Sequence, residues 1–554
     1  MRGNLRRLAL PLAAFVVLVV AATAGGAAAK GGTLVFGAEG DPVALDGALV
    51  SDGTSLRVLD QISEGLVDQK PGTTVVVPSL ATSWKGTKGG RVWTFNLRHG
   101  VVFHDSTPFN SKAVCFNFNR WYNFTGSFQS IDATYYWQQV FGGFKTTVGK
   151  SSDELLRTSL YKNCKPLGRY KVRITLTRGS ASFLAAMALR NFAIMSPAAL
   201  VKYGANKGEV DANGVFHPAG TFATKHPIGT GPFKFDSWTL GEKLVLVKNP
   251  KYWGRKALVD KVIFRPIADN AARLQALQTG EVNLYDLVDP QDFSTVEKNT
   301  GLRLQERGAF NVAYVGLQED KPPMNKLKVR QAVAYGLDRA SAVRAFYGRL
   351  GQVAKEFMPP SMEGYAKNVV TYPFNPDKAK QLLREAGLTL PVKLDFYYFT
   401  RVRGYLPAPK ETFEAFKASL ERSGFDITPH VLPFRPDYLS VAHKGEAGHL
   451  HMLGWIGDFG DPDNFLGVFF QRPNAEFGFK NPKIHRLLDR AESETNHKKR
   501  VALYQQANRL IMKDLPMVPF AHAKSAFGVQ KRVKGLIPSP VQIEWLRLIS
   551  IAGA

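Results

Sequence analysis

The sequence predicts a mixed α/β fold, in which strands and helices alternate along a chain of 554 residues. Three observations predict it. Stretches in the first half alternate apolar and polar residues with a period of two, and capped helical stretches follow in the second half. The composition, with 45% hydrophobic and 21% charged residues, is that of an ordinary globular chain. Because no long linker divides the chain after its first thirty residues, we expect interleaved domains, with the chain crossing between them more than once.

The first thirty residues have the pattern of a secretory signal peptide. Arg2, Arg6 and Arg7 precede an apolar stretch over residues 8–20, and the small residues that end at Ala29 offer a cleavage site. A signal peptide is favoured over a membrane span because the apolar stretch gives way to small residues. The pair of arginines could belong to a twin-arginine signal, but the rest of that pattern is weak, so the general secretory route is favoured. We therefore expect an exported protein on the periplasmic or extracellular face of the cell envelope.

Strands are predicted where aromatic and β-branched residues alternate with polar ones. The clearest stretches cover residues 93–97, 170–176 and 244–247, and a shorter one covers 101–103. Between them, segment 123–165 is rich in Gly, Ser, Thr and aromatic residues without a clear period. We interpret that segment as the irregular surface of an added subdomain.

Helices are predicted where apolar residues recur at helical spacing between caps. One begins after Asn375, a good N-cap, with Pro376 in the first helical position, and ends at Gly387. Two more are predicted over 328–337 and 498–513.

The sequence has two cysteines, Cys115 and Cys164. In an oxidising compartment such a pair suggests a disulfide, and the alternative is two unpaired, buried thiols. Neither cysteine lies near the predicted signal peptide, so we expect no lipid anchor on a cysteine there.

The formal net charge is +26. Nucleic acid is the first partner to consider for so basic a chain. The lysines and arginines are spread along the whole sequence, however, and an exported protein rarely meets nucleic acid. We therefore expect no nucleic-acid partner, and a basic surface suited to an anionic cell envelope.

The sequence contains none of three common enzyme motifs in complete form. Residues 149–151 resemble the end of a phosphate-binding loop, but Phe144 stands where that loop needs a glycine. A nucleophile elbow and a His-Glu-x-x-His zinc motif are both missing from the sequence. His449 and His451 could begin a metal site, but no further ligand motif accompanies them. We therefore expect neither an enzyme nor a protein with a metal or cofactor.

Ten short segments form an ordered series along nearly the whole chain after the signal peptide. They are residues 41–46, 51–57, 64–66, 78–84, 97–101, 103–105, 230–233, 249–254, 328–332 and 457–465. In this order they resemble the family 5 extracellular solute-binding proteins, the dipeptide and oligopeptide receptors of ABC importers.

The resemblance implies two α/β lobes of the periplasmic-binding-protein fold, with an extra subdomain in the first lobe and a hinge near 286–290 and 522–526. The implied segments are a signal peptide (1–29), the first lobe (30–288), the second lobe (289–523) and a C-terminal return to the first lobe (524–554).

The implied function is capture of short peptides between the closing lobes. A monomeric receptor would deliver them to membrane permease subunits that work with a cytoplasmic ATPase. Three alternatives stay open. The same fold could bind a non-peptide solute, such as a metal complex, a glutathione-like or a sugar-derived ligand, or it could act in sensing or adhesion. A secreted hydrolase on an unfamiliar fold is the third.

A free peptide carries an ammonium and a carboxylate, and a closed cleft must neutralise both. The stretch that begins at Trp455 matches the family segment whose Asp pairs with the ammonium, and the resemblance assigns that role to Asp458. Gly457 lets the backbone bend, and Trp455 offers an apolar wall. We expect Asp461 and Asp463 to cap backbone amides of this turn instead.

The carboxylate partner implied by the resemblance is Arg403. Dipeptide receptors carry an Arg-Pro-Tyr-x-Pro segment, and here Gly404 replaces its first proline while Tyr405 is kept. A guanidinium suits bidentate pairing with a carboxylate, and Arg401 is a nearby rival. Two residues of the first lobe that follow Gly53 are also expected to line the cleft, as in relatives. The candidate ligand-binding residues are Asp458, Arg403, Trp455, Gly457, Thr54, Ser55 and Tyr405.

Overall fold

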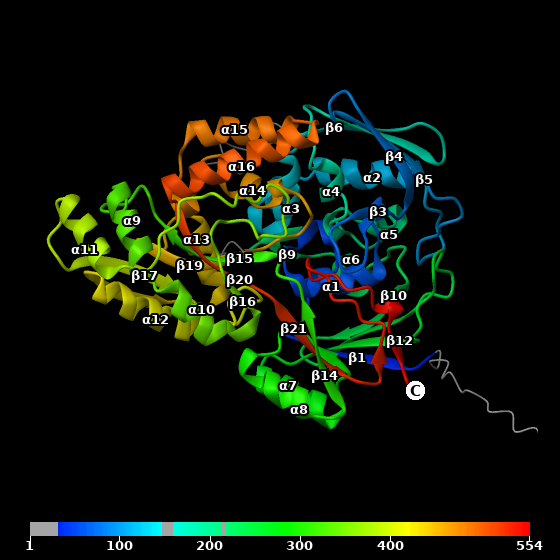
Figure 1. The fold of residues 1–554 in the computed structure, drawn as a ribbon. Coiled ribbons are helices and arrows are strands. Elements are labelled where there is room, and N and C mark those ends of the chain that lie inside the picture. Colours follow the sequence, from blue (N-terminus) through cyan, green and yellow to red (C-terminus); the bar gives the residue numbers. More distant parts are fainter. Residues whose placement is uncertain (1–30, 147–158, 212–215, 554) are drawn as a thin grey trace, which may run out of the picture.

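The computed structural model describes residues 31–146, 159–211 and 216–553 (Figure 1). The predicted signal peptide and the Gly-Lys-Ser stretch at 149–151 lie outside these residues. Two large sheets organise the chain, one of seven strands and one of six, and helices pack around both. The predicted two-lobed α/β fold is confirmed. No helix within the described ranges is both long and apolar enough to cross a membrane.

We call the part built around the seven-stranded sheet the first lobe. In spatial order its strands are β10 (Phe233–Thr239), β11 (Lys243–Lys248), β12 (Lys261–Pro266), β1 (Thr33–Ala38), β13 (Leu284–Tyr285), β21 (Ser525–Gln530) and β14 (Leu302–Arg307). Leu34 and Phe36 of β1 enter one apolar cluster and Val35 packs on another, so both faces of the sheet are covered. The helices of this lobe include α1 (Gly53–Ile62), α7 (Asn270–Thr279) and α8 (Phe293–Lys298).

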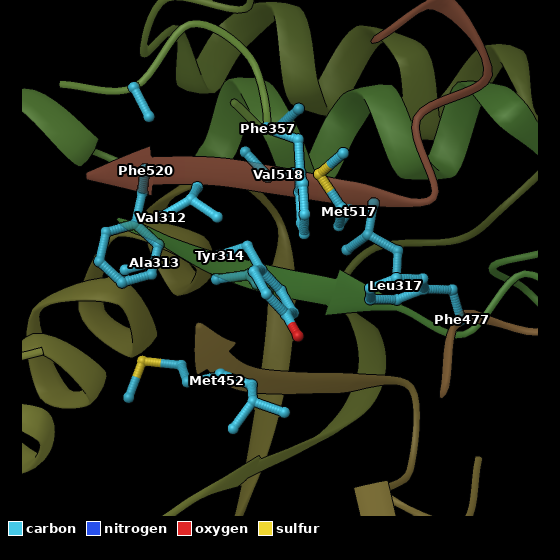
Figure 2. Close-up of a cluster of buried hydrophobic side chains, with 14 of the residues drawn as sticks. Val312, Ala313, Tyr314, Leu317, Phe357, Met452, Phe477, Met517, Val518 and Phe520 are labelled. Carbon is cyan, nitrogen blue, oxygen red and sulfur yellow. The ribbon is translucent and has the colours of Figure 1, made fainter. Parts of the chain in front are cut away.

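The second lobe is built around the six-stranded sheet. In spatial order its strands are β16 (Gly351–Val353), β20 (Met517–Ala523), β15 (Asn311–Leu317), β19 (Leu450–Ile456), β17 (Val392–Tyr398) and β18 (Phe425–Val431). Every residue of β15 is buried, and Tyr314 packs with Phe357 and Phe477 in the core (Figure 2). Its longer helices are α9 (Leu327–Gly336), α10 (Arg339–Tyr347), α11 (Pro376–Glu385), α12 (Pro409–Arg422), α15 (Pro482–Ser493) and α16 (His497–Asp514).

The predicted helices are confirmed as α9, α11 and α16. Asn375 caps α11 by accepting from the amide of Lys378, and Gly387 follows its end with φ +74°. The strand predicted over 101–103 is wrong, because Val102 forms only an isolated bridge to Pro108.

The chain passes between the two sheets at residues 308–310, after β14, and at Lys524, between β20 and β21. The second crossing lies within the predicted hinge segment 522–526. The first lies later than the predicted 286–290, because β14 pairs along its length with β21 and so extends the first sheet. The predicted boundary between residues 288 and 289 therefore places one strand of the first lobe in the second.

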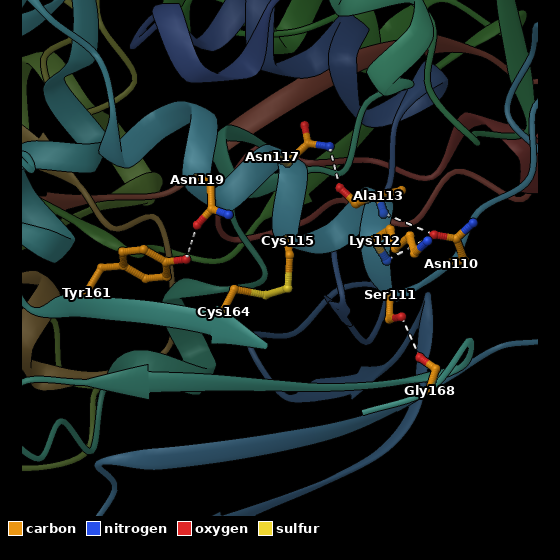
Figure 3. The surroundings of a disulfide bond; sticks show 10 residues. All are labelled: Asn110, Ser111, Lys112, Ala113, Cys115, Asn117, Asn119, Tyr161, Cys164 and Gly168. Atoms are coloured by element: carbon orange, nitrogen blue, oxygen red, sulfur yellow. Dashed lines mark hydrogen bonds between the residues drawn. A yellow bond between two sulfur atoms is a disulfide. The ribbon is translucent and has the colours of Figure 1, made fainter. Parts of the chain in front are cut away.

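The extra subdomain of the first lobe contains a separate four-stranded sheet. In spatial order its strands are β4 (Ala81–Thr87), β5 (Val92–Leu97), β7 (Lys171–Leu176) and β6 (Tyr161–Pro166), and two helices, α2 (Ser111–Tyr122) and α3 (Ile131–Phe141), accompany it. Helix α3 lies inside the segment that we interpreted as irregular, so that interpretation is wrong over its length. Cys115 of α2 and Cys164 of β6 are joined by a disulfide (Figure 3).

Exported protein is expected to show no free thiols when it is denatured without reductant, and two after reduction, because this disulfide joins the chain's only cysteines. The bond closes a loop across a sequence separation of 49 residues. Replacing both cysteines by Ala should lower the free energy of unfolding by about 3–4 kcal/mol in the chain-entropy model. Two titratable thiols without reductant would contradict the pairing.

Candidate functional site

Asp458 lies in a tight turn directly after β19. The side-chain oxygen of Asn464 accepts from the Asp458 amide at 2.7 Å, and the Asn464 amide group donates to Oδ2 of Asp458 at 3.1 Å. A Cβ on Gly457 would collide with the rings of Phe310 and Phe465, which explains the glycine there. The Gly457 amide donates to the Phe310 carbonyl at 2.8 Å. The turn therefore packs against the chain crossing at 308–310.

Two side chains of the first lobe reach Asp458 from the opposite side. The hydroxyl of Tyr136, on α3, donates to Oδ1 of Asp458 at 2.7 Å. The amide group of Gln69 donates to the Asp458 carbonyl oxygen at 3.1 Å. Asp458 thus stands where the extra subdomain meets the second lobe, as a ligand held between two lobes requires.

The carboxylate of Asp458 has no cationic partner among the residues that the structure describes. Its two oxygens receive only the neutral donors Tyr136 and Asn464. Desolvation by burial raises the pKa of Asp458 to about 6, although both hydrogen bonds lower it. An uncompensated carboxylate in such a place is stabilised when a cation arrives.

Trp455, on β19, lies between aromatic rings of both lobes. Its ring meets Phe469 edge-on at 5.2 Å between centroids and Tyr135 of α3 at 6.4 Å. The indole Nε1 is buried and has no hydrogen-bond partner within the described ranges. A buried donor without a partner is costly, so an acceptor group of a ligand would satisfy it.

Arg403 opens a tight turn in which its amide donates to the Leu406 carbonyl at 3.0 Å, and the Leu406 amide returns the bond at 2.8 Å. Its guanidinium lies 4.7 Å from the centre of the Phe434 ring. Its Nε is buried without a partner, and no carboxylate in the described part of the chain pairs with it. Arg403 is partly buried, whereas its rival Arg401 is exposed.

Tyr405 follows in the same turn, and its ring packs where a Cβ on Gly454 of β19 would stand. It is 4% exposed, and burial raises its pKa to about 12 although Arg403 lowers it. Tyr405 therefore joins the Arg403 turn to β19. A Cβ on Gly404 would lie 3.0 Å from Nε2 of Gln542, a residue of the C-terminal return to the first lobe. The Arg403 turn, like Asp458, thus stands at the meeting of the two lobes.

Ser55, which we expect to line the cleft, has a structural role within the first lobe. Its side chain is fully buried, and its Oγ accepts from the amides of Val43 at 2.8 Å and Ala44 at 3.4 Å. The hydroxyl thus holds the chain after β1 onto α1. Thr54, 8% exposed, lies beside it at the start of α1.

The two other aspartates of the turn have different partners. Asp461 accepts from the Asp463 amide, as predicted, and also forms a bidentate pair with Arg500 at 2.7 and 2.8 Å. Asp463 was expected to cap an amide, but its Oδ2 accepts from the Ser182 hydroxyl of the first lobe at 2.9 Å. Further contacts between the lobes lie close by, where Arg178 pairs with Glu492 of α15 at 3.2 Å.

His449 and His451 do not share a metal site. His449 lies 3.1 Å from a carboxylate oxygen of Asp395, and His451 lies 3.1 Å from Glu476. No cluster of three or more potential metal ligands occurs in the described part of the chain.

Sequence reasoning missed the contribution of α3 to this site. Tyr135 and Tyr136 face Trp455 and Asp458, and Gln69 and Gln542 complete the first-lobe side. The run of three aromatic residues at 135–137 was the available signal.

Comparison with known proteins covers nearly the whole chain. Residues 75–477 match the family model of bacterial extracellular solute-binding proteins, family 5. The chain is 30% identical to the dipeptide-binding protein of Escherichia coli, with 94% of each chain covered, and 30% identical to heme-binding protein A of Haemophilus influenzae, with 94% and 92% covered. The chain is also similar to a solved structure, that of the ABC transporter-associated periplasmic binding protein DppA of Helicobacter pylori in complex with the peptide STSA. The TM-score is 0.80 and the sequence identity is 29%. The match covers 94% of this chain and 98% of the DppA chain.

Proposed function

Since the chain belongs to the bacterial extracellular solute-binding proteins of family 5, which are not enzymes, we propose that it is the receptor of an ABC importer for short peptides. Peptides would be captured between the two lobes and delivered to a membrane permease. The signal-peptide pattern at the N-terminus supports a place outside the cytoplasmic membrane.

The observation that carries the peptide assignment is the carboxylate of Asp458. It lies between the lobes, receives neutral hydrogen-bond donors, has no cationic partner among the described residues, and has a pKa raised to about 6. A peptide α-ammonium supplies the missing charge. In this proposal the ammonium takes the place of, or joins, the Tyr136 hydroxyl at Oδ1.

Arg403 supports the peptide assignment as the partner of the peptide carboxylate. Its guanidinium is held by a closed turn and by the Phe434 ring, but no carboxylate of the described chain neutralises it. A peptide carboxylate would do so through paired hydrogen bonds. The buried Nε1 of Trp455 offers a further donor to a peptide carbonyl.

Binding of a non-peptide solute is the second candidate, because heme-binding protein A is as similar in sequence as the dipeptide-binding protein. Calorimetry separates the two. Free dipeptides and tetrapeptides should bind, whereas the same peptides acetylated at the N-terminus, and heme, should not. Binding of heme with indifference to every peptide would replace the peptide assignment.

Ligand is also expected to close the lobes about the crossings at 308–310 and Lys524. A ligand drives closure only when it contacts the closed state better than the open one. Small-angle scattering should show a smaller radius of gyration after a verified peptide is added, and the curve should then match the arrangement in which Tyr136 contacts Asp458. An unchanged curve at saturation would exclude this movement.

A further inference from the structure

The four-stranded sheet of the extra subdomain has one apolar face and one cationic face. Trp93 and Phe95 of β5, with Val172 and Ile174 of β7, are buried on the inner side. Residues that alternate with them are exposed or partly exposed on the outer side. Figure 1 places β4, β5 and β6 at the outer edge of the molecule.

The outer face carries a row of side chains that crosses all four strands. Lys85 of β4 pairs with Thr94 of β5, Thr94 pairs with Arg173 of β7, and Arg173 pairs with Lys165 of β6. Lys171 lies on the same face of β7, two residues before Arg173, and pairs with Asn96. With strands about 4.8 Å apart, the row spans roughly 14 Å.

These charges repel one another without compensation. Arg173 and Lys165 stand directly opposite on neighbouring strands, an arrangement that destabilises a sheet when the charges are alike. Residues 81–104 and 159–180, which contain all four strands, include no Asp or Glu. Within the described ranges, no ion pair is formed by any of the four cations of this face, Lys85, Lys165, Lys171 and Arg173. The four cations are therefore available to an anionic partner outside the chain.

We propose that this outer face docks the protein on an anionic lipid surface. A row of cations on one face, separated by small polar residues, suits a surface of headgroup phosphates, and anionic membranes attract such arrays. A protein partner fits less well, because interface cores are poor in Lys and rich in aromatic residues. Among the described residues, none of the large hydrophobic side chains that stand exposed belongs to these strands. The signal peptide pattern argues against nucleic acid.

The test is cosedimentation with large vesicles of phosphatidylcholine alone or with 30% phosphatidylglycerol. The parent protein is expected to bind the anionic vesicles at low salt, to lose that binding at high salt, and to ignore neutral vesicles. The variant with Lys85, Lys165, Lys171 and Arg173 all replaced by Gln should bind anionic vesicles on the order of 1000-fold more weakly. Its melting temperature should not fall, since the replacement removes a repulsion.

A matched control removes the same charge from exposed lysines of the second lobe, namely Lys393, Lys410, Lys483 and Lys498, each replaced by Gln. This control should keep the parent's affinity for anionic vesicles. Equal loss in both variants would mean that total charge acts rather than this face, and would overturn the proposal. So would a parent protein that ignores anionic vesicles at low salt, or that prefers an RNA oligonucleotide or an acidic protein to them. Peptide binding does not enter these measurements, so their outcome is separate from that of the proposed function.

Discussion

Asp458→Asn is expected to weaken binding of short peptides by a factor on the order of 10 to 1000. The substitution keeps the shape of the side chain and removes its charge, which leaves the peptide ammonium buried without a counter-ion. A hydrogen bond to a charged group contributes roughly 1.5–3 kcal/mol, and stranding one member of a buried ion pair costs roughly 3–5 kcal/mol. Isothermal calorimetry with one dipeptide measures the difference.

The pH dependence of this binding should identify the same carboxylate. With the lobes arranged as described and no cation present, burial raises the pKa of Asp458 to about 6, above its ordinary value, so the protonated form is favoured as the pH falls through 6. An ammonium favours the ionised form. Peptide affinity should therefore fall below pH 6, and binding near pH 6 should release a proton that buffer-dependent enthalpies reveal. Asp458→Asn should abolish that release.

Asp461→Asn is the matched control from the same turn. Asp461 pairs with Arg500 within the second lobe, and none of its hydrogen bonds among the described residues reaches the first lobe. This variant should lower thermal stability and leave peptide affinity nearly unchanged. Should Asp458→Asn bind peptide as the parent does, or should acetylation of the peptide N-terminus prove harmless, the ammonium has no role and the peptide assignment fails.

Arg307→Met is expected to lower the free energy of unfolding by about 3–5 kcal/mol. Arg307 ends β14, just before the chain leaves the first lobe, and is 2% exposed. It donates to both oxygens of Asp286, at 2.9 and 2.7 Å, and to Glu544 at 2.8 Å. Both carboxylates are buried. After the substitution Arg57 is the cation that remains in the cluster, and its single charge cannot neutralise both carboxylates.

Chemical denaturation at several pH values measures this effect. Burial alone would raise the pKa of Asp286, and Arg307 and Arg57 bring it below its ordinary value. A lowered pKa stabilises the fold above the ordinary value near 4 and ceases to do so as the pH falls through the lowered one. The gap between parent and variant should therefore be full at neutral pH and shrink in acid.

Arg303→Met serves as the comparison, because Arg303 lies on the same strand and its hydrogen bonds within the described ranges go to neutral groups, the Gln530 carbonyl and the Gln305 side chain. It should cost less than Arg307→Met and show little dependence on pH. A loss below about 1 kcal/mol for Arg307→Met at neutral pH would show that the cluster contributes little net stability.

Local features of the fold were predictable because their causes are local. The limits of α11 follow from Asn375, Pro376 and Gly387, all adjacent to the helix that they begin or end. The place of β14 was not predictable in this way. It belongs to the first sheet because it pairs with β21, which comes more than two hundred residues later. The sequence around β14 does not indicate that pairing.

The same contrast between local and distant causes applies to the candidate site. Asp458 and its turn were found because a contiguous stretch carries them, whereas Tyr136 was missed. Helix α3 has a kink with non-helical backbone angles at Thr134, and most of its residues are buried, so no apolar stripe marks it. Ser55 was assigned to the cleft by resemblance of its segment. Its burial depends on Val43 and Ala44, whose approach to α1 the sequence does not reveal.

The position of the last strands affects the order in which the protein can fold. β20 lies between β16 and β15 in one sheet, and β21 lies between β13 and β14 in the other. Both come from residues 517–530, near the end of the chain. Neither sheet can be completed until that stretch has been synthesised, and pairings between such distant segments form slowly. The nascent chain would therefore stay incompletely folded through most of its synthesis, which is the state that an export channel for unfolded chains requires.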